Sequence, residues 1–221
     1  MKNIIIIMAG GVGNRFGASI PKQYCLLKGR PVIDYVIDAA KGSKSADGII
    51  VVCDEHWVHL SKLLEESDFE HAPNGKERLN SLDNAFTLIK EKHPECEKII
   101  ILDAVAPFVT SELIDDYLDK LDDYDAVITC QKITGALGNY DFDPLDREKY
   151  YMTQSPESFR FKTLMPYFKT EFPSQELAWQ MPRETKKYLN FDFKENLKLT
   201  YDFQLREMEF RLENPGKIEF K

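Results

Sequence analysis

The sequence predicts an α/β fold in which a mostly parallel sheet is flanked by helices. The first observation is a set of four short apolar runs, rich in isoleucine and valine and not alternating with polar residues: 4–7, 48–53, 98–102 and 125–130. Such runs are typical of strands that are buried on both faces of a parallel sheet. The second observation is that amphipathic stretches separate these runs. Alternating strands and helices predict right-handed crossovers over one sheet.

The helices are predicted from apolar residues that recur every three to four positions, as Val32, Ile33, Val36 and Ile37 do within 31–40. The same reasoning, taken in order along the chain, predicts helices at 31–40, 56–64, 77–89, 111–121, 161–168, 175–181 and 203–212. One more strand is expected near 197–200, before the last helix.

Residues 131–147 break this alternation. They contain two glycines, an asparagine, several aspartates and a proline, with few apolar side chains. The segment is too long for an ordinary connection in a compact domain. We therefore expect an excursion away from the sheet, such as an arm or a hairpin, within a single domain that spans residues 1–221.

Composition limits the partners of the chain. Its 221 residues include 29 Lys plus Arg and 37 Asp plus Glu, which gives a net charge of −8. An acidic chain is a poor general binder of nucleic acid or of anionic membranes, and no apolar run approaches the ~18 residues of a membrane span. The four cysteines form no C-x-x-C motif, so reduced cysteines in a cytoplasmic protein are expected. We predict neither a nucleic-acid nor a membrane partner.

The most informative segment is the glycine-rich loop after the first strand. Gly10, Gly11 and Gly13 let backbone N–H groups approach phosphate oxygens, and Arg15 and Lys22 add two cations. The loop has neither the G-x-x-x-x-G-K-[ST] pattern of a Walker loop nor the third glycine of a dinucleotide fingerprint. Backbone donors together with arginine and lysine match the triphosphate of a nucleotide. The alternative is a glycine-rich turn with surface cations.

Residues 9–15, followed by 21–24, resemble the A-G-G/A-x-G-x-R…P-K-Q signature of the cytidylyltransferases that act on methylerythritol phosphate and on ribitol phosphate. The pair Gly10-Gly11, with Arg15 and Phe16-Gly17, is closer to the ribitol phosphate branch. Four later segments occur in family order. They resemble G-x-x-R-x-x-S at 75–81, H-D-x-x-R-P-F at 102–108, R-x(7)-T-P-Q-x-F at 147–159 and D-N-I-K-I-T at 195–200.

The resemblance implies a Rossmann-like sheet with a protruding dimerisation arm, here at 131–150, and hence a homodimer. It also implies a reaction in which CTP and a phosphomonoester give a CDP-linked product and pyrophosphate. The residues implied to bind CTP are Ala9, Gly10, Gly11, Gly13, Arg15, Lys22, Gly75, Arg78, Ser81 and Asp103. Those implied to bind the phosphorylated acceptor are Arg147, Ser155 and Lys198. The implied catalytic residues are Arg15, Lys22 and Lys198, and the implied Mg²⁺ ligands are Asp103 and Glu195.

Most of these polar residues also have an ordinary structural explanation. Asp103 could be a helix N-cap or a turn residue, and Glu195 could form a surface pair with Lys194. Lys198 and Arg147 could be solvated cations.

The departures from the family pattern fall mostly on the acceptor side. Ala106 stands where the family has arginine, Leu102 replaces histidine or threonine, and Glu195 replaces aspartate. Ser155 replaces threonine, and the acidic T-D-D-A segment is absent, with 174–177 in its place. These changes predict an atypical acceptor.

Three readings therefore remain open. The first is an enzyme that activates an alditol phosphate or a related phosphate for a surface polymer. The second is an isoprenoid enzyme that acts on 2-C-methyl-D-erythritol 4-phosphate. The third is a catalytically inactive homologue that binds CTP, for which the loss of arginine at position 106 is the argument.

Overall fold

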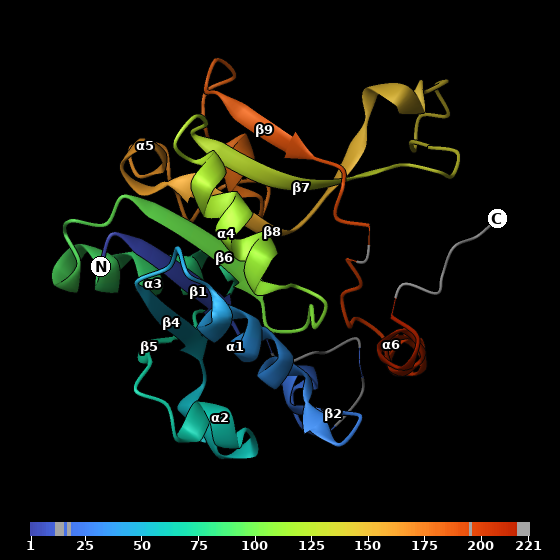
Figure 1. Cartoon of the computed structure of the whole chain (residues 1–221). Coiled ribbons are helices and arrows are strands. Elements are labelled where there is room, and N and C mark those ends of the chain that lie inside the picture. The colour runs from blue at the N-terminus through green and yellow to red at the C-terminus, as the bar shows by residue number, and fades with distance from the viewer. Residues whose placement is uncertain (12–15, 17–18, 195, 216–221) are drawn as a thin grey trace.

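A seven-stranded, mostly parallel sheet forms the centre of the computed structural model, which describes residues 1–11, 16, 19–194 and 196–215 (Figure 1). The strand order is β5-β4-β1-β6-β8-β7-β9, and β8 alone among these strands runs antiparallel to its neighbours. The strands are β1 (Asn3–Met8), β4 (Gly48–Cys53), β5 (Glu70–Pro73), β6 (Lys98–Asp103), β7 (Ala126–Lys132), β8 (Tyr151–Arg160) and β9 (Lys187–Asn190). The predicted α/β fold with a mostly parallel sheet is thus confirmed.

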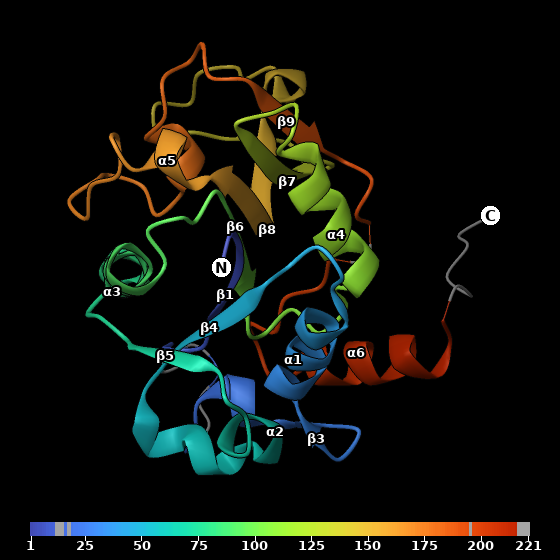
Figure 2. The ribbon, with the colours of Figure 1, turned by 60° about the vertical axis from the view of Figure 1, so that its left-hand side comes forward.

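Helices cover both faces of this sheet (Figure 2). One face packs against α3 (Arg78–Lys92) and α5 (Phe161–Leu164). The other face packs against α1 (Val32–Gly42), α2 (Lys62–Glu65) and α4 (Ser111–Lys120). The isoleucines of β1 alternate between the two layers, so each layer receives fully buried side chains from the same strand. This two-sided burial explains why the strand sequences are continuously apolar.

A third, smaller apolar cluster lies beside one end of the sheet. It joins the hairpin of β2 (Leu26–Leu27) and β3 (Arg30–Pro31) to the last helix, α6 (Gln204–Glu213). Leu199 is fully buried in this cluster, and its N–H donates to the carbonyl of Val105 at 2.9 Å. The segment before α6 is thereby held against the loop that follows β6.

Several predicted elements differ from the structure. The strand expected near 197–200 is not formed, because these residues bind the β6 loop through isolated contacts instead of a ladder. The helix expected over 56–64 divides into a 3₁₀ helix, η2 (Glu55–Leu60), and α2, since the Ser61 side chain caps a new helix. Only 161–164 of the helix expected at 161–168 is α-helical, and 175–181 contains only the 3₁₀ turn η4 (Leu177–Trp179).

The apolar pattern of the sequence did not predict β8, although this strand lies between β6 and β7. Pro156 interrupts it, and a proline normally argues against a central strand because it donates no ladder hydrogen bond. The structure accommodates the proline at a bulge. Ile128 pairs with Glu157 and Thr129 pairs with Gln154, so 155 and 156 are skipped in the register with β7.

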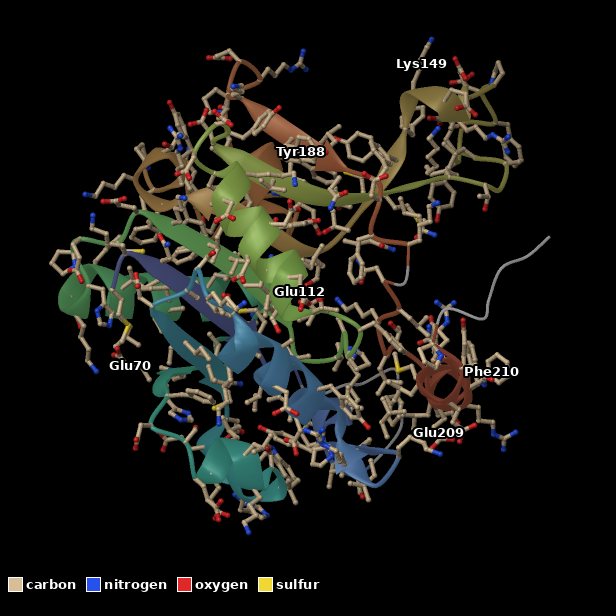
Figure 3. All side chains as sticks on the ribbon, in the orientation of Figure 1. Glu70, Glu112, Lys149, Tyr188, Glu209 and Phe210 are labelled. Carbon is tan, nitrogen blue, oxygen red and sulfur yellow. The ribbon has the colours of Figure 1, made fainter. Side chains whose placement is uncertain are left out.

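The segment between β7 and β8 projects from the body of the molecule (Figure 1). It contains the 3₁₀ turn η3 (Arg147–Lys149), and Lys149 points outward from it (Figure 3). Tyr140 and Phe142 are 102% and 94% exposed on this arm. The excursion predicted at 131–147 leaves the sheet from residue 133 onward and exposes aromatic side chains, since Gln131 and Lys132 still pair with β8.

Candidate active site

A cavity of about 590 Å³ lies at the edge of the sheet where β1 and β6 end. In open α/β sheets, ligands bind beyond the carboxyl ends of the strands. Several predicted residues come together here from five separate stretches of the chain: Gly10, Gly11, Lys22, Gly75, Arg78, Ser81, Asp103 and Lys198. Gly13, Arg15 and Glu195 lie outside the described residues.

Two glycine-containing loops form one wall of the cavity by close backbone approach. A Cβ atom added at Gly10 would lie 2.4 Å from the Cβ atom of Asn74, and one added at Gly75 would lie 2.5 Å from that of Asn80. A Cβ atom at Gly11 would meet nothing within 4 Å. The first two glycines are therefore required by packing, whereas Gly11 faces open space next to the cavity.

The start of α3 holds the second of these loops in place. Ser81 Oγ accepts a hydrogen bond from the N–H of Gly75 at 2.9 Å, and Asn80 Oδ1 accepts one from the N–H of Glu77 at 3.2 Å. Glu77 is the N-cap of the helix and forms a capping box with Asn80. The positive end of a 15-residue helix consequently points toward the cavity, which favours an anionic ligand there.

Charged side chains line the opposite wall. Lys198 Nζ lies 2.6 Å from Asp103 Oδ2, and Lys22 Nζ donates to the carbonyl of Leu199 at 2.7 Å. Burial opposes the ionisation of Asp103, but the ammonium of Lys198 and the guanidinium of Arg78 outweigh it, so the pKa of this carboxyl lies below its usual value. Asp103 is therefore ionised at neutral pH, and cations surround it.

The polar environment of Asp103 includes a residue that was predicted to bind the acceptor. Ser155 does not line the cavity; its Oγ atom accepts a hydrogen bond from the backbone N–H of Asp103 at 2.9 Å. The carbonyl of Ser155 accepts from the Asn196 side chain at 2.5 Å. In this structure Ser155 thus links β8 to the end of β6 and to the 196–200 segment.

Ala9 and Arg147, two further predicted residues, also lie outside the cavity lining. Ala9 is buried, and its carbonyl accepts from Gln23 Nε2 at 2.5 Å, which ties the glycine loop to the 3₁₀ turn η1 (Lys22–Tyr24). Arg147 lies on the arm, where Nη1 donates to the carbonyl of Thr134 at 2.8 Å. It lines a different cavity of about 440 Å³ at the base of the arm, together with Tyr150 and Phe191.

The described residues fit a metal ion only in part. Asp103 supplies one ionised carboxylate in the lining of the site, and Mg²⁺ commonly uses one or two carboxylates with substrate phosphates as its other ligands. Within 1–11, 16, 19–194 and 196–215, no three His, Cys, Asp or Glu side chains form a cluster that could hold a metal ion by themselves. Any Mg²⁺ bound at Asp103 would therefore depend on the nucleotide for further ligands.

Glu157 also belongs to this region, although no feature of the sequence marked it as a candidate site residue. It lies on β8, is 2% exposed, and its Oε1 atom is 2.7 Å from Arg78 Nη2. Burial raises the pKa of the Glu157 carboxyl to about 7, against the opposing effect of the Arg78 guanidinium. Its contact with Arg78 joins positions 79 residues apart, which no local motif would reveal.

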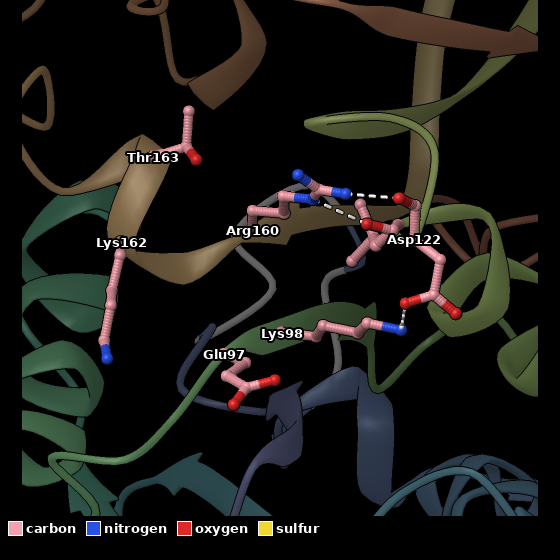
Figure 4. A pocket seen from close by; sticks show the side chains of 7 residues that line it. Glu97, Lys98, Asp122, Arg160, Lys162 and Thr163 are labelled. Atoms are coloured by element: carbon pink, nitrogen blue, oxygen red, sulfur yellow. Dashed lines mark hydrogen bonds and ion pairs between the residues drawn. The ribbon is translucent and has the colours of Figure 1, made fainter.

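A third cavity, of about 280 Å³, lies at the opposite edge of the sheet, where β6 begins and β8 ends (Figure 4). Two of its cations, Lys98 and Arg160, already have partners. Lys98 Nζ lies 2.7 Å from Asp122 Oδ1, and Arg160 Nε donates to the carbonyl of Leu121 at 2.6 Å. These contacts hold β6 and β8 against the end of α4, so this cavity has a structural explanation.

Comparison with known proteins identifies the family. Residues 3–184 match the family model described as 2-C-methyl-D-erythritol 4-phosphate cytidylyltransferase. The chain belongs to this family. It is therefore a cytidylyltransferase, a CTP-dependent nucleotidyltransferase, and the predicted resemblance is confirmed.

The relatives of this cytidylyltransferase carry names from two branches. It is 30% identical over 174 residues to a ribitol-5-phosphate cytidylyltransferase of Vibrio parahaemolyticus, which covers 74% of this chain and 73% of that protein. It is 29% identical over 175 residues to a 2-C-methyl-D-erythritol 4-phosphate cytidylyltransferase of Clostridium botulinum, covering 74% and 75%. It is 32% identical over 174 residues to the bifunctional ribulose 5-phosphate reductase/CDP-ribitol pyrophosphorylase Bcs1 of Haemophilus influenzae, and the match spans 74% of this chain but only 36% of that longer protein.

Solved structures show the same fold. The 4-diphosphocytidyl-2C-methyl-D-erythritol synthase of Anaerococcus prevotii superposes with a TM-score of 0.79 at 22% identity, covering 96% of this chain and 98% of that one. Among the described residues, no helix is long and apolar enough to cross a membrane.

Proposed function

We propose that this cytidylyltransferase transfers CMP from CTP to a phosphorylated alditol or a related small phosphomonoester, giving a CDP-linked product for the synthesis of a surface polysaccharide or cell-wall polymer. The observation that carries the proposal is the cavity at the ends of β1 and β6. Glycine loops and a helix N-terminus form one wall, and Lys22, Lys198 and Asp103 form the other. Such a site suits a nucleotide triphosphate beside a second phosphate.

The chemistry that this site supports needs no protein nucleophile. An oxygen of the acceptor phosphate attacks the α-phosphorus of CTP, the bond from that phosphorus to the bridging oxygen breaks, and pyrophosphate leaves. Two polyanions must meet, so positioning and charge stabilisation supply most of the catalysis. We assign Lys22 to the charge that develops on the transferred and leaving phosphates, together with Arg15 by resemblance. Lys198 lies beside Asp103, where it can contact the acceptor phosphate.

Mg²⁺ is part of the proposal. Asp103 would hold it, with Glu195 as the second carboxylate by resemblance, and the ion would neutralise phosphate charge when bound. Lys198 now occupies the Oδ2 atom of Asp103 at 2.6 Å. Because this ammonium can turn toward an acceptor phosphate, the carboxylate could exchange its partner without a change in the fold.

The ribitol phosphate branch is favoured over the methylerythritol phosphate branch by residues on both sides of the site. The Gly10-Gly11 pair resembles the first branch, and the acidic segment of the second is replaced by 174–177. Ala106 is 4% exposed and follows Asp103 in a tight turn, so it leaves no cation where the family has arginine. The alternative acceptor remains 2-C-methyl-D-erythritol 4-phosphate.

We further propose that the enzyme is a cytoplasmic homodimer in which the arm at 131–150 packs against a second copy. The almost fully exposed Tyr140 and Phe142 support this, because exposed aromatic side chains on a projecting segment are typical of interaction sites. Arg147, at the returning end of the arm, would then reach the acceptor phosphate in the neighbouring active site.

A pyrophosphate-release assay with CTP and a panel of phosphorylated polyols tests the proposal. We expect turnover with an alditol phosphate and little with 2-C-methyl-D-erythritol 4-phosphate. The reverse preference would assign the chain to the alternative. Equal turnover with UTP or ATP in place of CTP would contradict the proposed base recognition by the 75–81 segment.

A further inference from the structure

Glu157 has an unusual environment for a carboxylate. It is 2% exposed in the middle of the sheet, paired in register with Ile101 of β6 and Ile128 of β7. Its Oε1 atom accepts from Arg78, whereas its buried Oε2 atom has no hydrogen-bond partner among the described residues. A buried carboxylate with an unsatisfied oxygen is costly, so its presence calls for a physical reason.

The partner of Glu157 provides that reason. Arg78 is the first residue of α3, and it directly follows the 74–77 loop that lines the nucleotide cavity. Its Nη2 atom lies 2.7 Å from Glu157 Oε1, and its Nη1 atom donates to the carbonyl of Gln175 at 2.9 Å. One guanidinium therefore connects the start of α3, the centre of β8 and the segment before η4.

These contacts restrict what Arg78 can do in the cavity. Its side chain is only 26% exposed, and its two terminal nitrogens donate to Glu157 and to the Gln175 carbonyl. Gln175 also returns to the loop, since its Nε2 atom lies 3.4 Å from Glu77 Oε2. Arg78 is thus arranged to fix the position of the 74–77 loop.

We propose that Glu157 is a positioning residue for the transferase reaction, which acts by holding Arg78 so that the 74–77 loop is preorganised to receive the nucleotide. This rests on the nucleotide site proposed above. The closeness of the loop to its neighbours makes the geometry exacting, because Gly75 has no room for a side chain and its N–H is fixed by Ser81. A displaced Arg78 would move the N-cap and with it the wall of the cavity.

The family pattern quoted above has glutamine where this chain has Glu157. A glutamine can offer the same oxygen to Arg78 Nη2 without a buried charge, whereas an alanine cannot. Glu157→Gln is therefore the conservative variant that should preserve positioning, and Glu157→Ala is the variant that should abolish it.

The test is an equilibrium titration of CTP against the full chain, with KM and kcat measured in parallel and each variant kept below its melting transition. We expect Glu157→Ala to raise the Kd and the KM for CTP roughly tenfold or more, the scale for loss of a hydrogen bond to a charged group, while kcat changes less. Glu157→Gln should restore both constants to near the wild-type values.

The matched control is Glu70→Ala. Glu70 is also a paired carboxylate in this sheet, 3.0 Å from Lys92 Nζ. It is the first residue of β5, whereas the cavity is lined by Asn74, which follows the last residue of that strand. Its loss should leave CTP binding unchanged even where it lowers the melting temperature.

An unchanged Kd for CTP in Glu157→Ala, with a lowered melting temperature as in the control, would overturn the positioning role. Failure of Glu157→Gln to rescue binding would overturn it as well, because the proposal requires only the acceptor oxygen. A wild-type protein that binds no CTP would refute the nucleotide site itself, and this outcome is distinct from the other two.

Discussion

The buried carboxylate of Glu157 predicts a pH-dependent difference in stability between the wild type and Glu157→Gln. An unfolded chain ionises this glutamate near its ordinary pKa of 4.5, whereas burial in the folded protein raises the pKa to about 7. Raising the pH through this window therefore removes the proton from the unfolded state first and favours unfolding. Glutamine does not titrate, so the variant lacks this loss.

The magnitude follows from the size of the pKa shift. Each pKa unit corresponds to about 1.4 kcal/mol, so the rise from 4.5 to about 7 amounts to roughly 3 kcal/mol for this nearly inaccessible side chain. Relative to Glu157→Gln, the wild type should lose about this much unfolding free energy between pH 4 and pH 8. The stability that the protonated Glu157 carboxyl contributes is fully present below the ordinary pKa of 4.5, and it is lost as the pH rises through the folded-state pKa of about 7.

Urea unfolding of both proteins across this pH range measures the difference directly, because contributions from all other titrating groups cancel in the comparison. Glu70→Gln serves as the control, since the partners of that glutamate lower its pKa despite burial, and its difference from the wild type should therefore have the opposite slope with pH. A pH-independent gap between the wild type and Glu157→Gln would refute the reasoning.

Four further predictions concern the site. Gly10→Ala should weaken CTP binding by at least ~10-fold, because the added methyl group meets a facing Cβ atom at 2.4 Å, and Gly11→Ala should weaken it less; equal effects in titrations would contradict the packing argument. Asp103→Asn should abolish Mg²⁺-dependent turnover while circular dichroism shows an intact fold; melting alone would favour an N-cap role. Lys22→Ala should lower kcat by at least ~100-fold. When Lys22→Ala and Arg147→Ala subunits are exchanged, one site of each mixed dimer carries neither substitution and should recover activity. Failure to recover despite verified exchange would exclude a role for Arg147 across the interface.

The elements that could be predicted from the sequence are those with a continuous or a periodic pattern of buried apolar side chains. The strand that begins at Asn3 and the helix that begins at Val32 have continuous or periodic apolar patterns, and both form within a few residues of the expected bounds. The strand β8 could not be predicted in this way, because Pro156 and several polar residues hide its pattern and only its neighbours make it a strand. The edge strand β5 is four residues long and contains a glutamate, a histidine and a proline, so it carries too weak a signal.

The candidate site could be predicted as far as its residues belong to short motifs. Gly75 and Ser81 lie six positions apart, and the structure joins them by a hydrogen bond. The approach of Asn74 to Gly10 spans 64 residues, and the pair of Arg78 and Glu157 spans 79. Contacts of this kind depend on how the sheet brings separate loops together, and nothing local in the sequence specifies them.

The central claim is that the acceptor phosphate attacks the α-phosphorus of CTP in this site. The most direct test is a reaction of CTP with an alditol phosphate whose phosphate oxygens carry ¹⁸O, followed by ³¹P NMR and mass analysis of the product. Attack by the acceptor phosphate should give a CDP-linked product with ¹⁸O in the bridging position and unlabelled pyrophosphate. An unlabelled bridge, or label in the pyrophosphate, would contradict it.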